Sequence, residues 1–313
     1  MGPELSGVIV TPVTPFTPTL EIDEDAVREL TGYFLSVKGI NGIICNAHAG
    51  EGSALTPEER IRNIHTVREE VKGRMPVMSM VEAYGAAEAI RLIHQAQDAG
   101  AEAIMLCPPP IYAWHARRSP EVAIAFWREI CGAVDMPLIV FQYYTGSQHA
   151  YTHETLIQLV RENENIVGIK MAHGPDLARY AQDVEVLRTL DRQVAIMPAS
   201  GRFLHVLSLI GADGAVTGYP NFVAEEIVAL FEAAKTGESA RVLEVESRFR
   251  PVARVIASDP FYYMHQRYKE ATRLLGRIPN ALVRSPCLPP PEEDREQLRR
   301  ALAEMGRLEA AAV

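Results

Sequence analysis

One lysine of this chain lies among apolar residues, where an ammonium group is unfavourable. The chain has five lysines, and Lys170 is the one that lies inside an apolar run, IVGIKMA (166–172). Lysine is almost never fully buried without a partner. The other four lie near expected helix ends or on polar faces, where we expect solvent to reach the ammonium: Lys38, Lys72, Lys235 and Lys269.

A lysine in such a place can act as a nucleophile. Desolvation disfavours the ammonium form and lowers its pKa, and the resulting neutral amine attacks a ketone to form a Schiff base. Lys170 therefore predicts carbinolamine and imine chemistry. The alternative is that Lys170 extends from a strand end into solvent.

Short apolar runs alternate with amphipathic helical stretches along the first 235 residues. The runs lie at 7–13, 42–47, 76–81, 103–109, 137–143, 166–172, 193–199 and 214–218. Each is nearly continuous in apolar residues, as expected for strands covered on both faces. Eight such βα repeats favour an α/β fold, a (β/α)8 TIM barrel, over a doubly wound open sheet. Lys170 would then lie near the carboxyl end of a barrel strand, where barrel active sites are built.

The pattern changes in the last quarter of the chain. Up to there, helices have recognisable ends, such as the capping box formed by Thr56 and Glu59. Beyond it only helical patterns remain, punctuated by the proline-rich stretch PCLPPPEED. We expect a barrel over residues 1–235 and a C-terminal helical extension, packed on it, over residues 236–313.

Composition excludes several classes of function. The chain of 313 residues has 31 basic and 40 acidic side chains and a formal charge of −9. It has no basic stripe interleaved with aromatic residues, so we expect no nucleic-acid partner, and no apolar window long enough to predict a membrane span. Four widely spaced cysteines predict neither disulfides nor a zinc site. We expect a cytoplasmic protein that acts on small molecules.

Several motifs follow one another along the chain from about Gly7 to Pro289. They are GVIVTPVTPF, the HAGE turn leading into ALTPEER, GAEAIMLCPP, VGIKMA and GADGAVTG. Together they resemble the dihydrodipicolinate synthase and N-acetylneuraminate lyase family. The resemblance implies a (β/α)8 barrel that assembles as a homo-oligomer, a dimer or a tetramer, and forms a Schiff base between a strand-six lysine and pyruvate or another 2-oxo acid. That lysine is Lys170 here. No metal or organic cofactor is implied, because the iminium is itself the electron sink.

The resemblance also implies a tyrosine at the end of strand five whose hydroxyl relays protons. Counting from Pro137 without gaps places Phe141 there, with Gln142 in the position of the family's asparagine. A phenyl ring cannot transfer a proton, so Phe141 is expected only to line the substrate. Tyr143 has the same strand parity and is predicted as the substitute catalytic residue. The alternative is that Tyr143 and Tyr144 are packing or interface aromatics.

The family's Gly-Thr-Thr-Gly-Glu turn reads Ala-His-Ala-Gly-Glu at residues 47–51. Both threonine hydroxyls, which hold the 2-oxo acid carboxylate in the family, are lost, but the amides of Ala49 and Gly50 can still bind an anion. His48 is a candidate donor or general acid near neutral pH, or a loop histidine without a role. Val216, on the eighth run, is where the resemblance places the opposite side of this cradle.

Two further departures concern the second substrate. The arginine that grips the aldehyde's carboxylate in the synthases falls on Gly146, and the family's paired tyrosines fall on Pro109 and Pro110. Tyr112 and Trp114 lie just beyond, and Tyr112 is predicted to contact substrate. We therefore expect a relative of the synthases that is not a true dihydrodipicolinate synthase and takes a bulkier or less acidic aldehyde.

Other activities stay open at this point. A hydratase or dehydratase would use the same imine, and a catalytically inert barrel that senses a ligand would explain the missing tyrosine and threonines. Lys170 argues against an inert barrel, because an idle buried amine only costs stability. Only His149 and His153 show helical spacing, and two ligands do not make a metal site.

Overall fold

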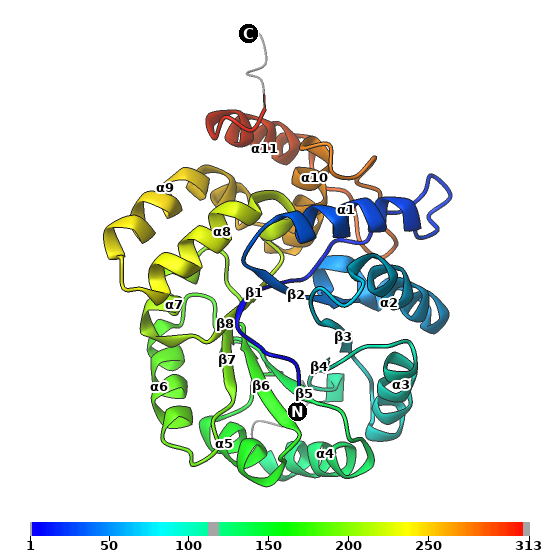
Figure 1. Ribbon diagram of the computed structural model, residues 1–313, viewed down its shortest axis with the longest axis vertical. Helices are drawn as coiled ribbons and strands as arrows, with labels where there is room; N and C mark the ends of the chain where they lie inside the picture. The colour runs from blue at the N-terminus through cyan, green and yellow to red at the C-terminus, as the bar shows by residue number, and fades with distance from the viewer. Residues whose placement is uncertain (1, 112–118, 309–313) are drawn as a thin grey trace.

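Eight parallel strands form a ring that is surrounded by helices (Figure 1). The structure is a computed structural model that describes residues 2–111 and 119–308. The strands are β1 (Gly7–Val10), β2 (Ile40–Cys45), β3 (Val77–Val81), β4 (Ile104–Leu106), β5 (Leu138–Gln142), β6 (Ile166–Met171), β7 (Ala195–Pro198) and β8 (Gly214–Thr217). Each falls within or overlaps one of the eight apolar runs, so the predicted (β/α)8 barrel is confirmed.

The sheet closes on itself. Its hydrogen-bonded order is β7-β6-β5-β4-β3-β2-β1-β8. Asp213, just before β8, bridges the two outer strands of this order: its backbone N–H donates to the Ile196 carbonyl at 2.9 Å, and its carboxylate accepts the Ile196 N–H at 2.7 Å. The ring of strands is therefore nearly closed between β7 and β8.

Helices cover the outside of the ring, and short 3-10 turns lie at its carboxyl end. The α-helices are α1 (Glu24–Ser36), α2 (Pro57–Val71), α3 (Ala86–Asp98), α4 (Pro120–Ala133), α5 (His153–Glu162), α6 (Leu177–Arg188), α7 (Leu204–Gly211), α8 (Pro220–Lys235), α9 (Ser239–Ile256), α10 (Met264–Leu274) and α11 (Glu292–Glu304). The 3-10 turns used below are η1 (His48–Gly50), η2 (Gly52–Ala54) and η5 (Phe261–Tyr263). The capping box predicted at Thr56 and Glu59 is present at the start of α2.

Two apolar layers hold the barrel together. One lies between the strands and the helices; the other fills the interior of the ring and includes Leu5, Ile9, Met105, Phe141 and Val216. Leu5 comes from the segment that precedes β1, so the amino-terminal segment packs into the interior layer. The interior is a packed core, so the usable end is the carboxyl end of the strands.

The last three helices, α9, α10 and α11, pack on one side of the barrel beside α8 and α1 (Figure 1). α10 also packs against the η1 turn that follows β2. The extension therefore contacts the end of the barrel that carries Lys170. The division of the chain at residue 235 stays a prediction.

Lys269 corrects one expectation. We expected solvent to reach it, yet it is 1% exposed on α10. Its Nζ donates to Glu51 Oε1 at 2.7 Å and lies 3.9 Å from the centre of the Phe16 ring. Burial lowers the pKa of Lys269 to about 8, against the opposing effect of Glu51. The helical pattern misled because α10 is covered on both sides, and the partner carboxylate is remote in sequence.

This buried pair should matter for stability. Removing one partner leaves an uncompensated buried charge, so Lys269→Met and Glu51→Gln should each lower the free energy of unfolding by about 3–5 kcal/mol. The matched control is Arg128→Met, which breaks the exposed Arg128–Glu162 pair and should cost less than about 1 kcal/mol. Denaturant unfolding measures both. Equal small losses in all three variants would show that the pair does not fasten the extension.

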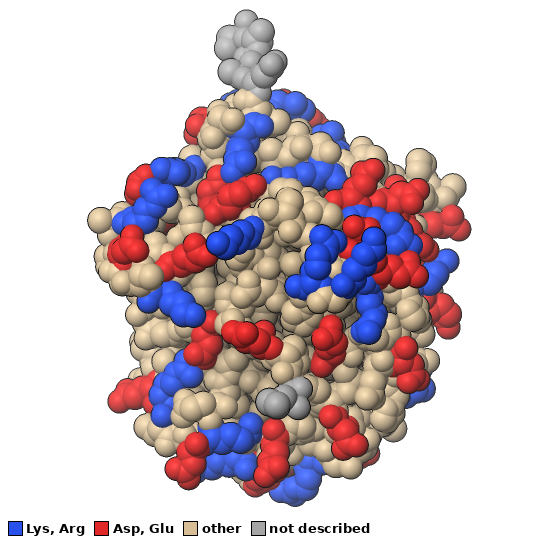
Figure 2. Space-filling view, viewed as in Figure 1, with Lys and Arg blue, Asp and Glu red and all other residues tan. Residues whose placement is uncertain are grey.

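Charges are mixed on the surface. On the face seen in Figure 2, acidic and basic side chains alternate without a stripe of one sign. Within residues 2–111 and 119–308, no helix is both long and apolar enough to cross a membrane.

Candidate active site

Lys170 lies one residue before the end of β6 and faces the barrel interior. In the sheet it is level with Phe141 of β5 and Met197 of β7, both members of the interior layer. Its Nζ lies 3.4 Å from the centre of the Phe141 ring. The amine is therefore held inside the ring of strands, where the sequence placed it.

The surroundings of Lys170 favour the neutral amine. Burial lowers its pKa to about 7, and the nearby Cys107 thiol opposes this only in part. In the described part of the chain, no carboxylate forms an ion pair with it. Lys170 is only partly buried, so solvent reaches it. A reachable amine that is about half neutral at pH 7 is suited to attack a carbonyl carbon.

Tyr143 and Phe141 form a stack at the end of β5. Their ring centres are 4.3 Å apart, with 10° between the planes. The Tyr143 hydroxyl lies 3.5 Å from His48 Nε2, a long contact. Burial raises the pKa of Tyr143 above its usual range, and Cys107 and Glu82 add to this. Tyr143 is thus a protonated phenol directed at His48, and its predicted place at the barrel mouth agrees with the structure.

His48 begins η1, directly after β2. Its ring centre is 5.5 Å from that of Phe141. Burial lowers the pKa of His48 to about 3, and Lys170 and His265 add to this effect. The expectation of an acid that titrates near neutral pH is therefore wrong, since this imidazole stays neutral. A neutral imidazole can still accept a proton at one nitrogen while it gives up another.

The predicted carboxylate cradle is only partly available. The Gly50 N–H donates to the Ala47 carbonyl at 2.9 Å, so the turn itself already uses this amide, contrary to expectation. A Cβ at Gly50 would lie 2.7 Å from the Pro12 carbonyl oxygen, so the turn requires glycine there. The Ala49 amide has no backbone acceptor among the described residues. It is the amide left for an anion.

The remaining predicted contacts have different outcomes. Val216 is fully buried in the interior layer and is level with Ile9 of β1, so it forms an apolar wall below the mouth. Tyr112 and Trp114 lie outside the described residues.

His265 is a residue of this site that sequence reasoning missed. It lies on α10, and its ring centre is 6.3 Å from that of His48. Burial and Lys170 lower its pKa to about 4. The only signal in the sequence was a histidine within a helical stretch of the extension, and nothing in that stretch indicates contact with the barrel mouth.

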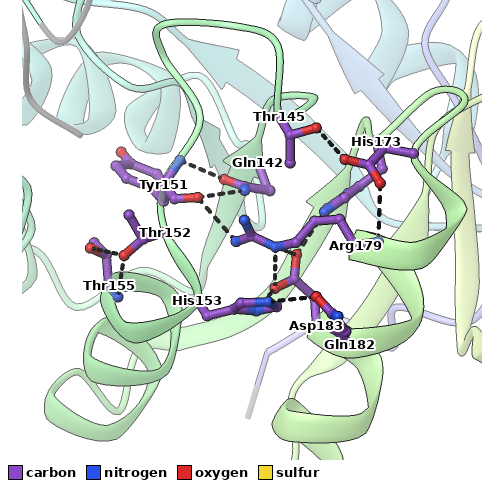
Figure 3. A network of polar contacts seen from close by, with 11 residues as sticks. Gln142, Thr145, Tyr151, Thr152, His153, Thr155, His173, Arg179, Gln182 and Asp183 are labelled. Atoms are coloured by element: carbon purple, nitrogen blue, oxygen red, sulfur yellow. Dashed lines mark hydrogen bonds and ion pairs between the residues drawn. The ribbon is translucent and has the colours of Figure 1, made fainter.

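A polar network holds the loops after β5 and β6 (Figure 3). The Asp183 carboxylate accepts from His173 Nε2 at 2.6 Å and from Arg179 Nε at 3.0 Å, and it pairs with His153. Gln142 exchanges two 3.0 Å hydrogen bonds with the backbone of Tyr151. These contacts fix the strand ends that carry Lys170 and Tyr143.

The two histidines with helical spacing do not form one site. His153 is bound to Asp183, whereas the His149 ring lies 5.6 Å from that of Tyr143. Among the described residues, no group of three His, Cys, Asp or Glu side chains is arranged to hold a metal ion.

Comparison with known proteins gives consistent matches. The model of the dihydrodipicolinate synthetase family matches residues 4–305. A 4-hydroxy-tetrahydrodipicolinate synthase of Methanopyrus kandleri is 30% identical over 98% of this chain and 99% of its own length. An uncharacterized DapA-like lyase of Pyrobaculum arsenaticum is 23% identical over 97% of this chain and 99% of its own length.

Solved structures agree. A chloride-inhibited dihydrodipicolinate synthase from Acinetobacter baumannii, complexed with pyruvate, has a TM-score of 0.87 at 26% identity and covers 97% of this chain and 100% of that chain. A monomeric dihydrodipicolinate synthase variant has a TM-score of 0.88 at 24% identity, with 97% and 98% covered, and supports the fold alone. These matches confirm the resemblance that the sequence motifs indicated.

Proposed function

Because the chain belongs to the dihydrodipicolinate synthetase family, we propose that it is a Schiff-base-forming lyase of the aldolase type that acts on pyruvate or a related 2-oxo acid. One observation carries the proposal. The Lys170 amine lies inside the barrel mouth, 3.4 Å from the centre of the Phe141 ring, with its pKa lowered to about 7 and without a carboxylate partner in the described part of the chain.

The reaction begins at this amine. The nitrogen lone pair attacks the keto carbon of the 2-oxo acid, and the carbonyl electrons pass to oxygen, which takes up a proton. The nitrogen gives up a proton, and the hydroxyl of the carbinolamine takes up a second proton and leaves as water, which gives an iminium. Loss of a proton from the adjacent carbon gives an enamine. The enamine carbon attacks the aldehyde carbon, the aldehyde oxygen takes up a proton, and water hydrolyses the new iminium to release the product and the free amine. The iminium supplies the electron sink, so this route needs no metal or organic cofactor.

The neighbouring groups can move the protons that these steps require. His48 is close enough for the Lys170 charge to shift its pKa, and the Tyr143 hydroxyl lies 3.5 Å behind it. A proton can therefore pass between the carbinolamine oxygen, the neutral imidazole and the phenol. The free amide of Ala49 is the proposed donor to the carboxylate of the 2-oxo acid.

The second substrate is proposed to differ from that of a dihydrodipicolinate synthase. By the ungapped count from Pro137, Phe141 falls at the position of the family's relay tyrosine, and Gly146 falls at that of the carboxylate-binding arginine. The proposed relay hydroxyl, that of Tyr143, lies two residues further along the chain, just past the end of β5, which changes where a proton can be delivered. The proposed second substrate is therefore an aldehyde that is bulkier or less acidic than the one used by a dihydrodipicolinate synthase. The cytoplasmic setting and the dimeric or tetrameric state stay predictions.

Reductive trapping tests the proposal. The protein is incubated with pyruvate or other 2-oxo acids and borohydride, and its mass is followed with and without each acid. A mass increment that depends on the 2-oxo acid is expected. A trapped protein that adds water to an unsaturated 2-oxo acid, but condenses no aldehyde, would indicate a hydratase. No increment with any 2-oxo acid would contradict the proposal and favour a ligand sensor.

The rate of trapping should depend on pH around neutrality. Only the neutral amine attacks, and its fraction rises as pH passes through the lowered pKa of about 7 for Lys170. The initial rate of imine formation should therefore increase by about 100-fold from pH 5 to pH 9 and then level off. A rate that keeps rising to pH 10 would show an amine with the ordinary lysine pKa.

A further inference from the structure

We propose that His265, carried by the C-terminal extension, determines substrate specificity at the Lys170 site by binding, together with His48, an uncharged hydroxyl-bearing aldehyde. This inference rests on the proposed function. It goes beyond that function because it assigns a role to the extension and a chemical class to the second substrate.

His265 lies beside the turn that carries His48. The helix α10 packs against η1, and the His265 ring lies 6.3 Å from the ring of His48 and 5.6 Å from that of Tyr268. A Cβ at Gly218, just after β8, would lie 2.6 Å from the Tyr268 ring. α10 is thus wedged between the turn after β2 and the end of β8, and His265 is directed into the barrel mouth.

A buried ion pair holds His265 in this position. Lys269 lies four residues after His265 on α10, on the same helix face. Its buried 2.7 Å bond to Glu51 fastens this face to the turn that carries His48. Two rings that are held in this way lose little freedom when a ligand binds between them.

The His265 side chain is partly exposed to solvent. The α10 residues from Gln266 to Thr272 are buried, whereas His265 keeps part of its surface accessible. His48 and Lys170 are also partly accessible. Each of the three side chains is therefore partly open to solvent, as a side chain that contacts a substrate must be.

The groups around His265 and His48 carry little charge. In the described part of the chain, the charged group that acts on either imidazole is Lys170, and both imidazoles stay neutral at pH 7. Tyr143, which stacks on Phe141, and the fully buried Cys107 hold their protons, and burial raises the pKa of the Glu82 carboxyl. The nearest further ammonium, that of Lys269, is bound to Glu51. Apart from Lys170, the groups named here, all in the described part of the chain, offer donors and acceptors to a hydroxyl but no free cation to a second carboxylate.

Two variants and one control test the role of His265. His265→Leu removes the hydrogen-bonding ring, and His265→Gln keeps a donor and an acceptor. The control, His205→Gln, changes a histidine on α7 that lies near Glu246 and Arg250 of α9. The probes are a hydroxyl-bearing aldehyde, its analogue without the hydroxyl, and an analogue with a carboxylate, each assayed for condensation with pyruvate.

The wild-type protein should prefer the hydroxyl-bearing aldehyde in kcat/KM. His265→Leu should lower kcat/KM for this aldehyde by about 10- to 100-fold, chiefly through KM, and abolish the preference over the analogue without the hydroxyl. His265→Gln should restore part of the preference, and His205→Gln should keep it. Reductive trapping with pyruvate should proceed in all variants.

Three outcomes would overturn the inference. The first is a wild-type preference for the carboxylate-bearing aldehyde. The second is an unchanged hydroxyl preference in His265→Leu. The third is an equal loss of trapping and condensation in both His265 variants, which would mark a structural role. Absence of trapping in the wild type would instead contradict the proposed function itself, so the two failures can be told apart.

Discussion

Replacing Lys170 by methionine should lower turnover by about 10⁴-fold or more, because the covalent intermediate can no longer form. Lys170→Arg should be equally inactive, since a guanidinium keeps a positive charge but does not attack a carbonyl at neutral pH. Steady-state kinetics with pyruvate and a panel of aldehydes measure the loss. Lys235→Met, at an exposed position on α8, is the matched control and should keep wild-type turnover.

The same variant has a stability readout with a defined sign. The pKa of Lys170 is about 7 in the folded chain against an ordinary 10.5. Between these values the unfolded chain binds more protons, so the contribution of Lys170 opposes folding more strongly as pH falls towards 7. Lys170→Met should therefore be at least as stable as the wild type at pH 7. Loss of activity together with loss of stability would point to a structural lysine.

Tyr143→Phe should lower kcat by about 10²- to 10³-fold. The substitution keeps the ring that stacks on Phe141 at 4.3 Å and removes only the hydroxyl that faces His48. The loss should therefore appear without a change in the unfolding midpoint. Tyr144→Phe, at a residue that is 50% exposed, is the control. Unchanged turnover in Tyr143→Phe would remove this residue from the mechanism.

A double variant tests whether the phenol and the imidazole act together. If Tyr143 and His48 form one relay, His48→Gln should cost about as much as Tyr143→Phe, and the double variant should be little worse than either. Additive losses in kcat would show two independent roles. Both results can be read from steady-state kinetics at saturating 2-oxo acid.

The fold could be predicted from the sequence because its signal is local. Each strand lies in a short apolar run, and several helices have their own end signals, such as the capping box at Thr56 and Glu59. The predicted apolar runs are longer than the strands because apolar and proline residues continue past the strand ends into the barrel mouth. The strand β1 ends at Val10, before Pro12, and β4 ends at Leu106, before Pro108. Proline cannot donate to the ladder, so pairing ends there although the apolar pattern continues.

The position of Lys170 inside the barrel could be predicted for a related reason. A charged residue inside a continuous apolar run is a conflict that the sequence itself displays, and such conflicts mark functional sites. The prediction that Tyr143 lies at the mouth followed from strand parity alone. That a phenylalanine, Phe141, stands where the resemblance implies the relay tyrosine could also be read from the sequence without coordinates.

The rest depended on contacts between distant parts of the chain. Lys269 was expected in solvent, but Glu51 and Phe16 bury it from the other end of the sequence. His265 enters the site only because α10 packs on η1. The neutral state of His48 follows from burial that the turn alone does not reveal. Local pattern carries no information about any of these contacts.

The central claim is that Lys170 forms the imine, and the most direct measurement is to locate the label after reductive trapping. The protein is treated with pyruvate and borohydride at pH 8, digested, and its peptides are mapped by mass. We expect the mass increment on the peptide that contains Lys170, and none on Lys269, whose amine is bound to Glu51. Label on Lys269, or an unmodified Lys170 across a panel of 2-oxo acids, would contradict it.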